Sequence, residues 1–140
     1  MATLERAIAI AAEAHTGQKS KEGSPYILHP IRVMMRVDGL DAKMAAILHD
    51  VVEDTDWTLD QLRTEGFSQP VLEAVDLLTH RDSEDYFAYV ARAGTNPLAK
   101  QVKLADLEDN MNVMRLATVG DKDLERMRRY HKAWLSLKGS

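Results

Sequence analysis

Apolar residues recur every three or four positions in several separate stretches of the chain, which is the spacing of amphipathic helices. Residues 3–16 show it first, from Leu4 to Ala11, and a polar loop at 17–25 follows. Further helices are predicted over 30–38, 42–53, 59–65, 70–79, 82–94, 97–114 and 121–137. No stretch has the alternation of β-branched residues that strands need. The pattern therefore predicts an all-α bundle of about eight helices, forming one domain over residues 1–140.

Capping residues stand where several of these helices should begin. Thr58 precedes the helix at 59–65, and Asn96 followed by Pro97 is a strong start signal. Asp41 and Asp82 are predicted to cap the helices that follow them.

Composition narrows the class of protein. Hydrophobic residues make up 45% of the chain, enough for a folded core, and there is no cysteine, so disulfides and thiolate metal sites are excluded. No apolar run is long enough to span a membrane. A net charge of −4 without a basic tract argues against nucleic acid as a partner, whereas a small anionic ligand is compatible with it. The absence of cysteine fits a cytoplasmic location.

Candidate chemistry begins at the end of the predicted helix 42–53. On a continuous helix, His49, Asp50, Glu53 and Asp54 fall within one arc. The surrounding residues are apolar, which indicates burial, and a buried charge needs a partner or a metal. The alternative is a solvated acidic helix end.

Two further signals lie elsewhere in the chain. Asp106 stands in an apolar stretch, where it is either a metal ligand or an ion-pair partner of Lys103 or Arg115. His29, fixed at a helix entrance by Pro30, can present its ring rigidly. Together with the pair at 49–50, these residues supply two imidazoles and two carboxylates, a mixed set suited to Mn, Fe or Zn.

These motifs, in this order, resemble the HD-domain superfamily of metal-dependent phosphohydrolases. More narrowly, the chain resembles the small stand-alone hydrolases of the RelA/SpoT family, which remove the 3′-diphosphate from guanosine tetra- or pentaphosphate. The resemblance is carried by Ala14–Gln18, Gly23–Pro30, Leu48–Thr55, Val102–Asp106 and Asn110–Met111.

The resemblance implies a role for each motif. The ligands of one metal ion, Mn²⁺ by preference, would be His29, His49, Asp50 and Asp106. The acidic pair that positions and deprotonates water would be Glu53 and Asp54. The substrate, a small-molecule nucleotide, would be contacted by Lys19, Lys21, Asn110, Arg126 and Tyr130.

The chain departs from the family pattern at two positions near the nucleotide. Ser20 stands where the family has an arginine that stacks on guanine, and Val113 replaces a threonine near the ribose. The first departure motivates an alternative substrate, such as a dinucleotide cofactor phosphate or a nucleoside monophosphate. A non-catalytic nucleotide-binding module is the alternative from another class.

The remaining candidates have simpler interpretations. His15 matches a motif but is expected to have a supporting or core role. His80 and His131 are predicted to lie at the surface, and the basic stretch 126–132 to form a solvated helix face. The methionines at helical spacing are predicted to fill the core; they are Met34, Met35, Met111 and Met114.

Overall fold

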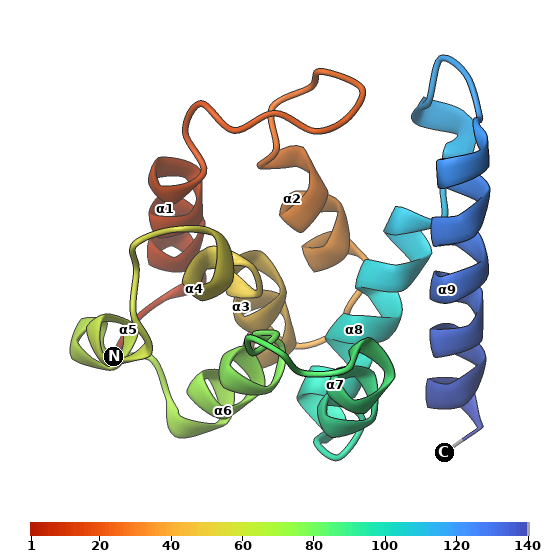
Figure 1. Ribbon diagram of the computed structural model, residues 1–140. Helices are drawn as coiled ribbons and strands as arrows, with labels where there is room; N and C mark the ends of the chain where they lie inside the picture. The colour runs from red at the N-terminus through yellow and green to blue at the C-terminus, as the bar shows by residue number, and fades with distance from the viewer. Residues whose placement is uncertain (140) are drawn as a thin grey trace.

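A computed structural model describes residues 1–139, and these residues fold into α-helices joined by short loops (Figure 1). The α-helices are α1 (Leu4–Ala14), α2 (Leu28–Met35), α3 (Leu40–Leu48), α4 (Val51–Asp54), α5 (Leu59–Glu65), α6 (Gln69–Leu77), α7 (Tyr86–Ala93), α8 (Pro97–Asn110) and α9 (Asp121–Lys138). A 3-10 turn, η1 (Val113–Arg115), follows α8. No strand occurs in the described residues, so the all-α prediction is confirmed.

Local capping explains where several helices begin. Thr58 forms a capping box with Gln61 at the start of α5. Asn96 accepts hydrogen bonds from the first amides of α8. The predictions for Asp41 and Asp82 were wrong. Gly39, with a φ of 92°, precedes α3, which leaves Asp41 inside the first turn, and the side chain that caps α7 is Asp85.

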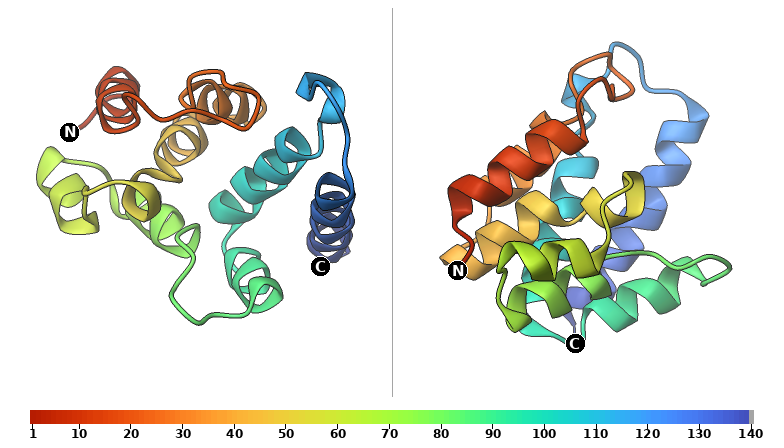
Figure 2. Two further views of the ribbon diagram at one scale, coloured as in Figure 1. Left: turned by 45° about the horizontal axis from the view of Figure 1, so that its top comes forward. Right: turned by 90° about the vertical axis from the view of Figure 1, so that its left-hand side faces the viewer.

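Helix α3 lies at the centre of the molecule. Its residues Ala45 to Leu48 are all fully buried, and it packs against α1, α2, α6 and α8. A helical stretch that is apolar on every side, as these four residues are, is stable only where neighbours cover all of it. A second, smaller core joins α7, α8 and α9 around Tyr89 and Leu107. Figure 2 shows α9 lying along the outer side of α8.

The helix predicted over 42–53 is interrupted. Helix α3 ends at Leu48, and α4 begins at Val51, so His49 and Asp50 form the junction. The imidazole Nδ1 of His49 lies 2.6 Å from the carbonyl oxygen of Ala46, a main-chain acceptor in the last turn of α3. The assumption of one continuous helical arc was therefore wrong, because a side chain takes part in the hydrogen bonding of the helix end.

Other surface features also differ from the predictions. The helix expected to reach position 114 ends at Asn110, and Met114 in η1 is 90% exposed. Met35 is 70% exposed, so neither methionine fills the core, whereas Met34 is buried.

No helix within residues 1–139 combines the length and apolar character needed to cross a bilayer.

Candidate active site

A cleft of about 510 Å³ opens between the loop that follows α1, the α3–α4 junction, and the helices α8 and α9. Three of the four predicted metal ligands, His29, Asp50 and Asp106, line this cleft, and His49 is buried beside Asp50 and Asp106. The cleft is also lined by all of the predicted catalytic and substrate-binding residues: Glu53, Asp54, Lys19, Lys21, Asn110, Arg126 and Tyr130. The fold thus brings together residues from five separate segments of the chain.

His29 comes from the first turn of α2 and faces α8. Its Nε2 lies 2.9 Å from Oδ1 of Asp106, and its Nδ1 lies 2.6 Å from Oδ2 of Asp109. Burial works to lower the pKa of His29, but the hydrogen bonds with Asp106 and Asp109 raise it above its usual value. The ring is therefore held between two carboxylates, 77 and 80 positions away in sequence.

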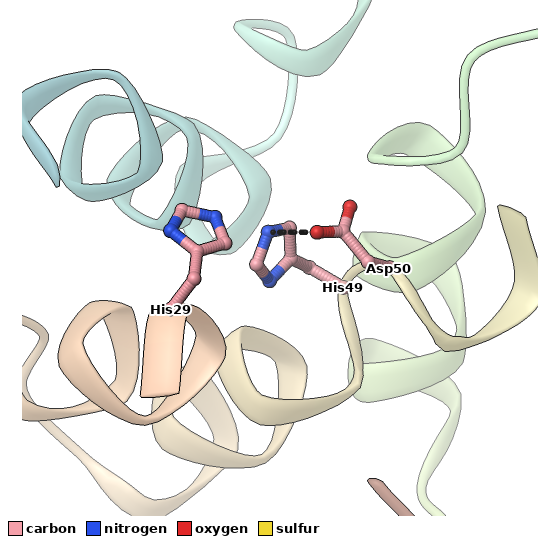
Figure 3. Close-up of side chains that lie close together, drawn as sticks. All are labelled: His29, His49 and Asp50. Carbon is pink, nitrogen blue, oxygen red and sulfur yellow. Dashed lines mark ion pairs between the residues drawn. The ribbon is translucent and has the colours of Figure 1, made fainter. Parts of the chain in front are cut away.

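His49 occupies the helix junction beside Asp50, with its ring turned toward His29 (Figure 3). Since its Nδ1 donates to Ala46, the neutral ring carries a free lone pair on Nε2. That nitrogen is buried and lies 3.1 Å from Oδ2 of Asp50 and 3.4 Å from Oδ1 of Asp106, but without the geometry of a hydrogen bond. It is an orphaned buried acceptor pointing at two carboxylates.

The two carboxylates are each held from behind by a donor. Asp50 accepts a hydrogen bond from the hydroxyl of Tyr26. The Nζ of Lys103 lies 2.9 Å from Oδ2 of Asp106, which leaves Oδ1 of Asp106 facing both imidazoles. Of the two ion-pair partners considered for Asp106, Lys103 is therefore present, whereas Arg115 contacts Asp109 instead.

The protonation states of His49, Asp50 and Asp106 depend on the charges that these residues and Lys103 place beside one another. Burial would raise the pKa of Asp50, but the positive charge that His49 carries when protonated lowers it to about 2. Burial likewise opposes ionisation of Asp106, yet Lys103 and the imidazoles hold its pKa well below the usual range. In turn, although burial disfavours the imidazolium, Asp50 and Asp106 raise the pKa of His49 well above its ordinary value. The carboxylates therefore attract a positive charge to the centre of the group.

This donor set fits a divalent transition metal. His29, His49 and Asp50 each offer one ligand atom, and these atoms lie within 4.8 Å of one another. Oδ1 of Asp106 adjoins both imidazoles. Two imidazoles with carboxylate oxygens suit Mn, Fe or Zn, and the orphaned Nε2 of His49 is a lone pair that a cation would satisfy.

The acidic pair on α4 lies at the rim of the cleft, more exposed than His29, His49 and Asp50. Oε1 of Glu53 accepts a hydrogen bond of 2.6 Å from the backbone N–H of His80. Partial burial and the charge of Asp50 raise the pKa of Glu53 despite that hydrogen bond. For Asp54, partial burial together with Asp50 and Glu53 raises the pKa to about 6. Both carboxyls are thus better proton acceptors than ordinary acidic side chains.

Cations gather at the other end of the cleft, between the loop after α1 and α9. Partial burial and the nearby Arg126 and Arg129 lower the pKa of Lys21. Arg126 pairs with Asp123, and Arg129 rests on the rings of Tyr86 and Tyr130, 5.1 and 5.5 Å from their centres. The basic stretch of α9 is therefore more than a solvated face, because Arg126 and Arg129 both line the cleft.

Three contacts at the site were not expected from the sequence. Tyr26 lies inside a quoted motif, but nothing in the pattern indicated that its hydroxyl reaches Asp50. His80, predicted to be a surface residue, lines the cleft and holds Glu53. Asp109 is fully buried against His29, and its position three residues after Asp106 is the one signal that could have suggested it. His15 is buried beside Tyr26, as expected for a supporting residue.

The HD domain family matches residues 7–128, and the chain belongs to this family. Among its relatives, a guanosine-3′,5′-bis(diphosphate) 3′-pyrophosphohydrolase of Aquifex aeolicus is 32% identical over 123 residues, which are 79% of this chain and 18% of that protein. A GTP pyrophosphokinase of Streptomyces coelicolor is 39% identical over 126 residues, 80% of this chain and 15% of that protein.

The fold is shared with a solved structure, a metazoan ortholog of SpoT that hydrolyzes ppGpp. The TM-score is 0.80 and the identity 25%, over 98% of this chain and 85% of that one. The chain spans less than a fifth of the length of the two curated relatives described above. The family resemblance stated from the motifs is confirmed.

Proposed function

We propose that this chain hydrolyses guanosine 3′,5′-bis(diphosphate) and its pentaphosphate analogue, giving GDP or GTP and pyrophosphate, in alarmone degradation during the stringent response. The observation that carries the proposal is the cleft itself. A cluster of imidazoles and carboxylates lies on its floor, a pair of acids lies at one rim, and the cationic side chains of Lys19, Lys21 and Arg126 lie at the other end. The names of the relatives above support the choice of substrate.

His29, His49, Asp50 and Asp106 would hold one divalent metal ion, which we propose to be Mn²⁺. When bound, such an ion lowers the pKa of water and polarises a phosphoryl oxygen. The protein's own part is to keep the donors in place. Tyr26 restrains Asp50 from behind, and Lys103 restrains Asp106.

Glu53 would accept the proton of the attacking water. Its carboxyl is at the cleft, is outside the ligand cluster, and has a raised pKa, as a proton acceptor at neutral pH requires. The water oxygen bonds to the phosphorus nearest the 3′-oxygen, and the bond between that phosphorus and the 3′-oxygen breaks. Asp54, with a pKa of about 6, would return a proton to the 3′-oxygen or orient Glu53.

The cationic end of the cleft would bind the remaining phosphates of the nucleotide. Lys19 and Lys21 come from the loop and Arg126 from α9, and phosphate contacts with such groups are charge-assisted. Asn110 and Tyr130 would contact the nucleoside. We propose a small-molecule substrate rather than nucleic acid, because the chain as a whole carries a net charge of −4.

A release assay tests the proposal. The Mn²⁺-loaded protein would be incubated with guanosine 3′,5′-bis(diphosphate), its adenine analogue, a dinucleotide cofactor phosphate and nucleoside monophosphates, with products separated by ion-exchange chromatography. We expect pyrophosphate and GDP from the first compound. Hydrolysis of another nucleotide alone would replace the proposed substrate, and binding without hydrolysis of any compound would indicate a non-catalytic module.

A further inference from the structure

We propose that Asp109 is a positioning residue for the metal site, holding the Nδ1–H of His29 so that only Nε2 of that ring can bind a metal ion. The inference rests on the metal site proposed above and is independent of the nucleotide. It concerns a residue outside the ligand cluster, connected to that cluster through one imidazole.

The two faces of Asp109 are occupied by different partners. Oδ2 lies 2.6 Å from Nδ1 of His29, while Oδ1 lies 2.8 Å from Nε of Arg32 and 3.4 Å from Nη1 of Arg115. Arg115 also donates to the backbone carbonyl of Asp109, at 3.0 Å. A fully buried carboxylate is stable only with such compensation, so the guanidiniums keep Asp109 ionised and immobile.

An ionised carboxylate can only accept hydrogen bonds, so the ring nitrogen that faces Asp109 must carry a proton. Nε2 of His29 lies 2.9 Å from Oδ1 of Asp106, and the centres of the His29 and His49 rings are 5.4 Å apart. While Nδ1 carries a proton, Nε2 is the ring nitrogen whose lone pair can bind a metal ion. Asp109 therefore selects which nitrogen of His29 is available as a ligand atom.

The orientation of the His49 imidazole is fixed in the same way, by a different hydrogen-bond acceptor. Nδ1 of His49 donates to the main-chain carbonyl of Ala46, which leaves Nε2 toward Asp50 and Asp106. Both rings thus present Nε2 to one point. The His49 contact is part of the helix end, whereas the His29 contact depends on a side chain and can be removed by substitution.

The residues that hold Asp109 come from different parts of the cleft. Arg32 belongs to α2, Arg115 to η1, and Nε of Arg115 lies 3.5 Å from Oε1 of Glu22 in the loop after α1. Here the carboxylate divides its oxygens between the arginines and a ligand imidazole, which is the arrangement of a residue that orients a ligand.

The test compares Asp109→Asn with Glu108→Gln, a matched loss of one negative charge from the neighbouring position of α8. Glu108 contacts Trp134 and Arg36 and lies away from the cluster. The dissociation constant for Mn²⁺ alone would be measured by competition with a chelating dye, after circular dichroism has shown that each variant is folded. We expect Asp109→Asn to weaken binding by about 10- to 100-fold and Glu108→Gln to leave it unchanged.

A second measurement needs no variant. In the wild-type protein loaded with Zn²⁺, which is diamagnetic, NMR correlations within the imidazole rings should place the proton of His29 on Nδ1. A proton on Nε2 would overturn the inference, as would a folded Asp109→Asn protein that binds Mn²⁺ as tightly as the wild type. A wild-type protein that binds neither metal would overturn the proposed metal site itself, and this inference with it.

Discussion

Replacing Glu53 by glutamine tests the proposed proton acceptor with little change to the structure. Oε1 of Glu53 accepts the backbone N–H of His80, and the amide oxygen of glutamine can do the same. Glu53 lies outside the cluster formed by His29, His49 and Asp50, so metal binding should be retained. What is lost is the carboxylate, whose raised pKa suits it to take a proton from water.

The magnitude follows from the role. Removing a general base costs about 10²- to 10⁴-fold in rate, which corresponds to about 2.7–5.5 kcal/mol on the barrier. We expect Glu53→Gln to lower kcat by this factor while KM changes little, because the cations proposed to bind phosphate are at the other end of the cleft. The assay is pyrophosphate release by Mn²⁺-loaded protein, with metal content measured on the same samples.

The control is Glu73→Gln, an exposed glutamate on α6 that is not part of the cleft. It should leave kcat and metal content unchanged. Near-normal turnover by Glu53→Gln with full metal content would refute the reasoning and assign the role of proton acceptor to Asp54. A loss of metal in Glu53→Gln would instead show that this carboxylate supports the ligand cluster.

Three further outcomes are expected. His49→Ala should strip the metal, and elemental analysis showing full metal content in this variant would contradict the ligand assignment. Metal occupancy in the wild type should fall as the pH is lowered, because protons compete for imidazoles whose pKa is raised in the metal-free protein. The raised pKa of Asp54, about 6, means that its contribution to stability is present at acid pH and lost as the pH rises through 6. Asp54→Asn should therefore stabilise the metal-free protein at pH 8, by less than about 1 kcal/mol because the group is exposed, and an unchanged or lower melting temperature would argue against this. Ser20→Arg should increase the preference for guanine over adenine by about 2- to 30-fold, which corresponds to the stacking of one cation on the base. If the ratio of kcat/KM for the guanine and adenine substrates is the same in the variant and the wild type, position 20 does not contact the base.

Local sequence signals predicted most of the helices correctly because helix ends are decided within a few residues. Thr58 caps α5, and Asn96 with Pro97 begins α8, since each side chain reaches amides only two or three positions away. The residue types suited to a metal site were also visible in the sequence, because only imidazoles and carboxylates in apolar surroundings offer that chemistry.

The interruption of the helix at His49 and Asp50 was decided by the tertiary structure. Both residues are compatible with a continuous helix, and apolar periodicity continues across them. In the folded chain, Nδ1 of His49 turns back to Ala46 while Asp50 is drawn to the hydroxyl of Tyr26. The contact with Tyr26 becomes available only when the loop before α2 packs against the end of α3.

The partners of the buried charges could not be read from the sequence either. Arg115 was considered a partner of Asp106, yet it contacts Asp109, and the carboxylate of Asp109 meets His29 from 80 positions away. Capping and periodicity are properties of neighbouring residues, so the sequence by itself determined the helices and the kinds of ligand. Which acid faces which imidazole depends on how α2 and α8 pack together, and that was decided only by the tertiary structure, because burial of a charge is stable only beside the partner that packing supplies.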